Sequence, residues 1–270
     1  MKPLYSLFLA LCLNFPSAWA DQVVHMHIAV SERHTQGLSR PGEYRLSWQL
    51  LERILADDKH FEVTPSSLAW SWSQTQLQQG KLDAVFFAAK TEERSKWAQF
   101  SPPLTVSRAG FYSLPGTPPK TIQQLKRAWQ PVGVIEGSAQ SQFLRDNGFD
   151  NFYGLVESDA LFQMLQGGRI EHIFILQSLA NHYCSLNARE HQQPCLIAGE
   201  MPMETTIHLM GNLGDPAFAN FSIAIAQGLK KLVASDDVRQ LYEENGLPPD
   251  SYQKWLAQFN AYIPVVQHRR

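Results

Sequence analysis

Two stretches of the chain, LQQGKLDAVFF at residues 77–87 and LQGGRIEHIFI at residues 165–175, can be laid over each other residue by residue. In each copy the end of a helix is followed by a glycine, a basic residue, an apolar residue, an acid and an apolar strand. Gly80 and Gly168 hold the same place in the two copies, where a helix commonly ends in a conformation that favours glycine. The repeat predicts two units of similar structure.

The segments that precede the two copies also correspond. Apolar periodicity predicts the pattern β-α-β-α-β in each half, and strands that alternate with helices predict a mostly parallel sheet covered on both faces. The predicted elements of the first half are a strand at 24–30, a helix at 44–56, a strand at 61–64 and a helix at 73–79; those of the second are a strand at 131–135, a helix at 139–147 and a strand at 152–156.

Two apolar segments, residues 104–114 and 205–210, are predicted to run between the halves. Helical patterns at 218–233 and 238–245 follow the second crossing and are expected to pack on the first half. Two crossings predict a hinge, and a hinge predicts a cleft. The predicted organisation is a signal peptide at 1–20, a discontinuous lobe one at 21–113 and 206–270, and a lobe two at 114–205.

The N-terminus indicates export. Lys2 precedes an apolar run at residues 4–13, and Ser17-Ala18-Trp19-Ala20 forms a small-residue cleavage site. We therefore expect a mature protein in the periplasm. The formal net charge is −2 at pH 7 and no basic block occurs, which argues against nucleic acid or anionic lipid as a partner. We expect a monomer whose first partner is a small molecule.

Two cysteines remain after the leader, Cys184 and Cys195. In an oxidising compartment their short separation favours a disulfide bond. The alternative is a metal site formed with His182 and His191, although the tight ligand spacing of structural zinc sites is absent. His25 and His27 share one face of the first strand, so they are either metal ligands or half-buried strand residues. We expect neither a metal nor another cofactor.

Several motifs resemble the extracellular solute-binding proteins of family three, the polar amino-acid type. They are GKLDAV at 80–85, TEER at 91–94, FSP at 100–102, VGVIEGS at 132–138 and GRIE at 168–171. The resemblance covers nearly all of the mature chain. It implies a periplasmic-binding-protein fold of two α/β lobes with mostly parallel sheets, joined by a two-crossing hinge, and delivery of a ligand to an ABC-type transporter.

The departures from the family pattern make this chain an atypical member. Binders of this type usually place a hydroxyl where this chain has Ala89, a threonine where it has Ala139, and an aspartate for the ligand's α-ammonium where it has Leu176. We therefore expect no tight binding of common α-amino acids. Gln177 or Glu136 would compensate if the strand register were shifted by one.

Arg94 is the first candidate for ligand contact, because a guanidinium binds carboxylate or phosphate with two parallel hydrogen bonds. Without the resemblance it would be interpreted as a solvated helix residue. Ser138 is either a helix cap or a ligand contact beside free N–H groups. Trp70 and Trp72 stand where the subfamily commonly has W-x-R. The predicted ligand-binding residues are Arg94, Trp70, Trp72, Ser138, Gln140, Phe87 and Gln177.

These observations favour a binding protein that closes on a small anionic or zwitterionic solute, and not an enzyme. One alternative is a periplasmic sensor that reports its ligand state to a membrane signalling partner. A second is a lyase on the same scaffold that would use Glu136 as its general acid or base. No nucleophile elbow and no phosphate-binding glycine loop occurs in the sequence.

Overall fold

The structure is a computed structural model that describes residues 23–187 and 195–267. The predicted signal peptide and His191 lie outside these ranges. Among the described residues, the helices fall short of the length and apolar character that a membrane span requires.

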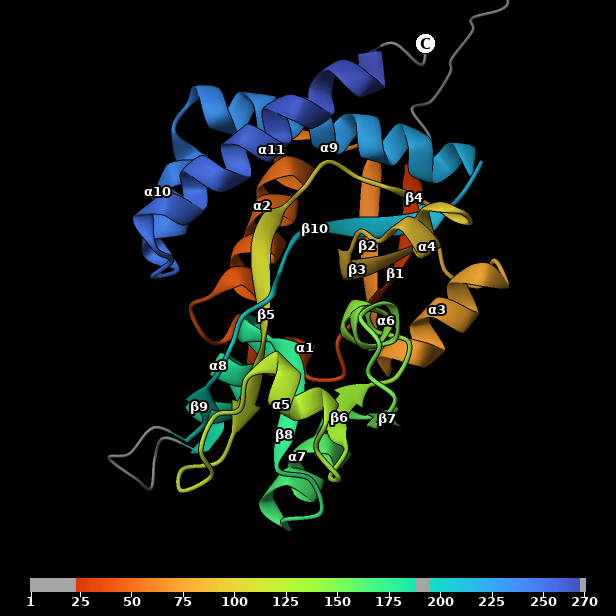
Figure 1. Cartoon of the computed structure of the whole chain (residues 1–270). Helices are drawn as coiled ribbons and strands as arrows, with labels where there is room; N and C mark the ends of the chain where they lie inside the picture. Colours follow the sequence, from red (N-terminus) through yellow and green to blue (C-terminus); the bar gives the residue numbers. More distant parts are fainter. Residues whose placement is uncertain (1–22, 188–194, 268–270) are drawn as a thin grey trace, which may run out of the picture.

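Two units with the same order of elements form the centre of the molecule (Figure 1). In the first unit the strands pair in parallel in the spatial order β2-β1-β3, and in the second the order is β7-β6-β8. The sequence repeat is therefore a repeat of structure. The first unit contains β1 (Val24–Val30), α1 (His34–Leu38), α2 (Glu43–Asp57), β2 (Phe61–Ser67), α3 (Trp70–Gln78) and β3 (Ala84–Ala89); the second contains β6 (Val132–Ile135), α6 (Ala139–Asp146), β7 (Phe152–Leu155), α7 (Ser158–Gln166) and β8 (His172–Leu176).

The two repeat glycines end α3 and α7 in the same way. Gly80 has a φ of 68° and Gly168 a φ of 67°. In both turns the glycine N–H donates to the carbonyl three residues earlier, and the next N–H donates to the carbonyl five residues earlier. A side chain at such a φ costs about 1–2 kcal/mol, which explains why glycine stands at both positions.

Two long strands run between the units and join their sheets. β5 (Thr105–Ser113) pairs antiparallel with β8, and β10 (Met203–Asn212) pairs antiparallel with β3. Because β5 and β10 also pair with each other, the hydrogen-bonded ladder is continuous in the order β2-β1-β3-β10-β5-β8-β6-β7. The two predicted crossings thus form the middle of one mixed sheet. The units are therefore connected by two strands that are hydrogen-bonded to each other.

The C-terminal helices return to the first unit, as Figure 1 shows for the blue end of the chain. α9 (Pro216–Ala234) and α10 (Asp237–Glu244) lie close to their predicted positions and share one apolar core with α2. Short elements complete the fold: β4 (Ala98–Phe100) pairs with β10, and β9 (Ile197–Ala198) pairs with β5. The remaining helices are α4 (Glu92–Ser95), α5 (Ile122–Lys126), α8 (Gln177–Asn187) and α11 (Pro249–Gln267).

Two details differ from the predicted elements. Helix α3 begins at Trp70 rather than at Ser73, so both tryptophans lie in its first turn. Helix α11 was not predicted, although Tyr252, Trp255, Leu256 and Phe259 recur at helical spacing. Trp255 anchors it: the ring is fully buried, and Nε1 donates to the carbonyl oxygen of Pro103 at 2.7 Å.

Cys184 and Cys195 form the predicted disulfide bond, with their Cα atoms 5.3 Å apart. The bond joins α8 to the segment before β9, beside the apolar core of the second unit. No group of three or more potential metal ligands occurs in the described part of the chain. His25 faces Glu62 on β2, with 3.2 Å between Nδ1 and Oε2.

Candidate functional site

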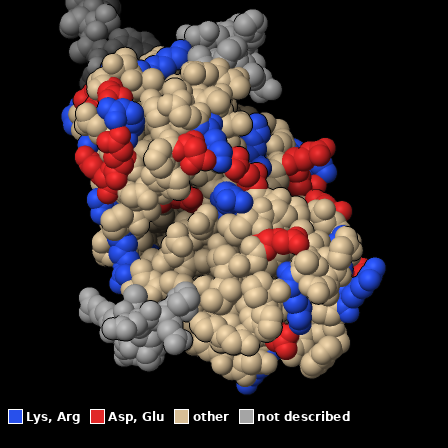
Figure 2. All heavy atoms as spheres, turned by 60° about the vertical axis from the view of Figure 1, so that its left-hand side comes forward, with Lys and Arg blue, Asp and Glu red and all other residues tan. Residues whose placement is uncertain are grey.

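A cavity of about 740 Å³ lies between the two units. Figure 2 shows the hollow on the side where the units meet. Its walls include the carboxyl ends of β1, β3 and β8 and the first turns of α2, α3, α6 and α8, which is where open α/β sheets bind ligands. Six of the predicted residues line it: Trp70, Phe87, Arg94, Ser138, Gln140 and Gln177. Trp72 is not among the lining residues, and 52% of its surface is exposed.

Arg94 is buried in the wall of this cavity, with 5% of its surface exposed. The T-x-x-R motif has a local cause, because Thr91 caps α4 by accepting a hydrogen bond from the Arg94 N–H at 3.2 Å. The guanidinium lies 4.7 Å from the Trp70 ring centre, and Nη1 donates to the Ala89 carbonyl at 2.7 Å. Burial lowers the pKa of Arg94 to about 10, and no acid pairs with it among the described residues.

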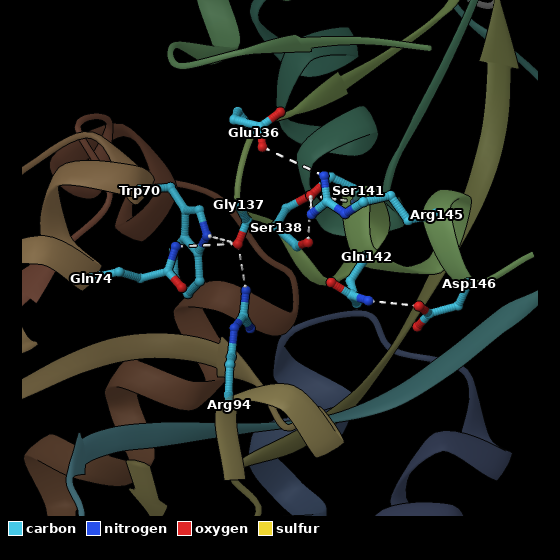
Figure 3. A network of polar contacts seen from close by, with 10 residues as sticks. All are labelled: Trp70, Gln74, Arg94, Glu136, Gly137, Ser138, Ser141, Gln142, Arg145 and Asp146. Carbon is cyan, nitrogen blue, oxygen red and sulfur yellow. Dashed lines mark hydrogen bonds and ion pairs between the residues drawn. The ribbon is translucent and has the colours of Figure 1, made fainter. Parts of the chain in front are cut away.

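The main-chain carbonyl of Gly137 connects the two units at this point (Figure 3). Its oxygen accepts from Trp70 Nε1 at 3.0 Å, Gln74 Nε2 at 3.2 Å and Arg94 Nη2 at 3.0 Å. The three donors come from the first unit, and Gly137 belongs to the β6–α6 turn of the second. A carbonyl oxygen has only two lone pairs, which is one fewer than the three donors that surround this oxygen. An anion, with more acceptor sites and a full charge, would match the three donors better.

The first turn of α6 supplies two more predicted residues. Ser138 caps the helix, since its hydroxyl accepts from the Ser141 N–H at 3.0 Å, so its side chain has a structural partner. Gln140 is buried, and its Nε2 has no hydrogen-bond partner. A buried donor without a partner is costly, and at a cavity wall a ligand acceptor can satisfy it.

Phe87 lies in a β-bulge that turns its backbone. The register of β3 against β10 shifts between His208 and Met210, and Phe87 has a φ of 63°. A bulky residue in this conformation carries strain of about 1–3 kcal/mol. Its ring centre lies 5.0 Å from that of Tyr44, and both rings line the cavity. Together with Trp70 they make an aromatic wall.

Comparison with solved structures identifies the architecture. A histidine kinase sensor domain with similarity to periplasmic binding proteins matches with a TM-score of 0.69 and 14% identity over 83% of this chain and 96% of that one. The arginine-, lysine-, histidine-binding protein ArtJ from Geobacillus stearothermophilus matches with a TM-score of 0.66 and 15% identity over 82% and 94%. The glutamate-bound ligand-binding core of GluR0 from Nostoc punctiforme matches with a TM-score of 0.65 and 15% identity over 83% of this chain and 100% of that one.

The chain has the two-lobed fold of the periplasmic binding proteins. The resemblance to family-three solute-binding proteins is thereby confirmed for the fold. No family model matches the sequence, and no curated protein matches it. At these identities the likeness fixes the architecture, and the ligand has to be argued from the residues of this chain.

The positions that depart from the family pattern lie together. Ala89 and Ala139 form one buried apolar cluster with Ile207 of β10, and Leu176 packs against it. Ala89 ends β3, while Ala139 and Leu176 belong to the second unit, so the cluster spans the two units beside Arg94. In the described structure this part of the cavity wall is therefore apolar, where the family pattern has a carboxylate and two hydroxyl groups.

Glu136, the acid of the lyase alternative, is not among the lining residues. Its side chain is 47% exposed and lies 3.6 Å from Arg145, measured between Oε1 and Nη1 (Figure 3). The exposure and the paired cation are those of a surface ion pair, which places this acid outside the candidate site.

Several residues in or beside the cavity wall were not predicted. Gln74 and the Gly137 carbonyl form a hydrogen bond between segments that are far apart in the chain, and no local motif predicts such a contact. Glu43 begins α2, where an acid is favoured by the helix dipole alone, so its sequence position indicates nothing further. His182 lines the cavity with a buried Nε2 that has no hydrogen-bond partner. It was considered only as a metal ligand.

Proposed function

We propose that this chain is a periplasmic solute-binding protein whose lobes close on a small ligand with an anionic group, which Arg94 binds. Delivery to an ABC-type transporter is its role in this proposal. The lobes are those predicted from the sequence, 21–113 with 206–270 and 114–205, and β5 and β10 act as the hinge. The protein is a monomer that needs no metal or cofactor.

The observation that carries the proposal is the environment of Arg94. A cation in a buried wall is costly unless an anion compensates it, and its two hydrogen-bond acceptors here are main-chain carbonyls, which carry only partial charge. Trp70 Nε1, Gln74 Nε2 and Gln140 Nε2 add donors near the same place. A carboxylate or phosphate that replaced the Gly137 carbonyl would satisfy these donors with a full charge.

The test is a thermal-shift screen of anionic solutes, followed by calorimetry on each solute that raises the melting temperature. A ligand that binds only the folded state stabilises it by RT ln(1 + [L]/Kd). The variant Arg94→Ala should bind any such ligand at least about tenfold more weakly, because loss of one partner of a desolvated charge pair costs about 2–5 kcal/mol.

Lys96→Ala is the matched control. Lys96 follows the same short helix, but its side chain is exposed and pairs with Glu93 at 2.5 Å, so its removal changes the net charge equally without touching the cavity. Equal affinity in folded Arg94→Ala and in the parent protein would remove Arg94 from the site and end the proposal in this form.

A sensor is the second candidate, since a histidine kinase sensor domain is among the structures of the same fold. The two roles separate in cells. Delivery predicts that deletion of the protein abolishes uptake of the radiolabelled ligand, whereas sensing predicts unchanged uptake and loss of the transcriptional response to the ligand.

A further inference from the structure

A second polar group lies in the cavity wall beside the crossing strands. Glu43 is the first residue of α2 and lines the cavity. Its Oε2 accepts a hydrogen bond from the hydroxyl of Ser107, a fully buried residue of β5 that pairs with Thr205 of β10. Gly42, the residue before it, donates its N–H to Asn245 Oδ1 at 3.3 Å, which ties this turn to the end of α10. Ser107 thus holds the carboxyl group, while the Gly42 contact fixes the backbone beside it.

No cation neutralises this carboxyl group. Glu43 makes no ion pair within the described residues, and burial raises its pKa to about 7, against a smaller opposite effect of the Ser107 hydrogen bond. Arg108, on the same strand as Ser107, acts on Asp250, Lys254 and Tyr112, and it is not among the groups that shift Glu43.

Two tyrosines complete the electrostatic surroundings of Glu43. Tyr112 of β5 and Tyr242 of α10 are the titratable groups that respond to its charge. Burial raises the pKa of both, in the case of Tyr112 to about 12, so both are neutral at physiological pH. Neither tyrosine therefore supplies a positive charge to Glu43.

Glu43 and Arg94 line the same cavity, and each lacks a partner of opposite charge among the described residues. Several lining residues near them are apolar or aromatic, namely Phe87 and Ala89 on β3, Tyr44 after Glu43, and Val106 before Ser107, while Arg45 and Arg108 line the cavity as well. A cavity with one buried cation, one half-buried acid and apolar wall residues is complementary to a dipolar molecule with an apolar spacer. Figure 2 shows that acidic atoms lie within the hollow itself; the acidic lining residues are Glu32, Glu43, Glu204 and Asp250.

We infer that Glu43 and Ser107 form the second pole of the ligand site, and that the ligand carries a cationic donor, such as a primary ammonium group, separated from its anionic group by an apolar spacer. This inference rests on the proposed function. The apolar cluster of Ala89, Ala139 and Leu176 beside Arg94 supports the separation, because an ammonium group next to the anion would meet no acceptor there.

A purely structural role is the competing explanation. If Glu43 were protonated and served only to accept the hydrogen bond from Ser107, it would carry no charge and would need no cationic group from a ligand. The two explanations differ in what ligand binding does to the proton: a cationic group favours the carboxylate, so its binding lowers the pKa of Glu43 and releases a proton, whereas a structural carboxyl group releases none.

The experiment uses the mature protein and the unbranched ω-aminocarboxylates from β-alanine to 6-aminohexanoate, each paired with the alkanoate of equal chain length. Calorimetry at about pH 6, in buffers of different ionisation enthalpy, reports both affinity and proton release. We expect at least one ω-aminocarboxylate to bind at least about tenfold more tightly than its alkanoate and to release a proton.

The variant Glu43→Gln should abolish both the preference for the amino group and the proton release. It is isosteric and can still accept from Ser107. Glu62→Gln, which changes an exposed acid on β2, is the control and should behave as the parent protein. Ser107→Ala is a second variant and should weaken the preference without abolishing it.

Equal affinity for the two members of every pair, an unchanged preference in Glu43→Gln, or no binding of any ω-aminocarboxylate would overturn the inference. Arg94-dependent binding of alkanoates or other anions in those cases would leave the proposed function standing, so the two failures are distinguishable.

Discussion

Arg94 Nη2 donates to the main-chain carbonyl oxygen of Gly137 across the cavity, at 3.0 Å. Trp70 and Gln74 donate to the same oxygen, so that three side chains of one unit hold a single backbone atom of the other (Figure 3). The arrangement stabilises the closed approach of the units without a ligand, and it occupies donors that an anion would use.

The first prediction concerns this contact. Trp70→Phe keeps an aromatic face for Arg94 but removes the Nε1 donor, and Gln74→Leu removes the other; each hydrogen bond contributes about 0.5–1.5 kcal/mol. The double variant should populate a more open form, with a larger radius of gyration by small-angle scattering of the ligand-free protein. Trp72→Phe, in the same helix but outside the cavity, serves as the control and should leave the radius unchanged.

The second prediction concerns common α-amino acids, none of which should bind with micromolar or better affinity. Burial of an α-ammonium group against the cluster of Ala89, Ala139 and Leu176 lacks an acceptor, which makes its desolvation expensive. Calorimetric titration with the twenty common amino acids decides this. The combined variant with Ala89→Ser, Ala139→Thr and Leu176→Asp should gain affinity for at least one of them. Micromolar binding by the unaltered protein would contradict the prediction.

The third prediction concerns the pH dependence that Glu43 imposes. The pKa of Glu43 is raised to about 7 in the folded protein. Its contribution to the free energy of unfolding is therefore complete at pH values below the ordinary glutamate pKa, and it is lost as the pH rises through 7. The free energy of unfolding should therefore fall, relative to Glu43→Gln, by about 3 kcal/mol between pH 4 and pH 8. Urea unfolding of both proteins measures the difference, and a constant difference would be inconsistent with a perturbed carboxyl group.

The fourth prediction has the opposite sign. His208 is buried between the Ser101 carbonyl and the Thr206 hydroxyl, each at 2.7 Å, and burial lowers its pKa to about 4. The contribution of the neutral His208 to the free energy of unfolding is complete above the ordinary pKa of histidine and is lost as the pH falls towards 4. At pH 5 this loss amounts to about 2 kcal/mol. The contribution of Glu43 changes in the opposite sense over the same pH range, so the loss has to be measured as a difference between proteins that both retain Glu43. Denaturant unfolding at pH 7 and pH 5 should show that the parent protein and the exposed-site control His25→Gln each lose about 2 kcal/mol relative to His208→Gln.

The fifth prediction tests the strain at Phe87. Glycine adopts a φ of 63° without the penalty that alanine carries there. Phe87→Gly should therefore be more stable than Phe87→Ala by about 1 kcal/mol, although both lose the packing of the ring against Tyr44. Thermal or urea unfolding of the pair measures it. If alanine proved the more stable, the bulge would not be strained.

Much of the fold could be predicted from the sequence because its signals are local. The repeat of residues 77–87 and 165–175, the glycines at 80 and 168 and the apolar periods place the helices and strands of both units, since backbone conformation and burial of one face act over a few residues. The same holds for the T-x-x-R motif, in which Thr91 and Arg94 are neighbours on one turn.

The tertiary structure decided what depends on segments far apart in the chain. The sequence indicated that two segments cross between the units, but their pairing into one continuous sheet arises from hydrogen bonds between strands about a hundred residues apart. It favoured Arg94 first and did not distinguish the two tryptophans, whereas packing placed Trp70 in the cavity wall and left Trp72 outside it. Glu43 carried no signal at all, because an acid at the start of a helix is ordinary, and only burial against Ser107 makes it a candidate ligand contact.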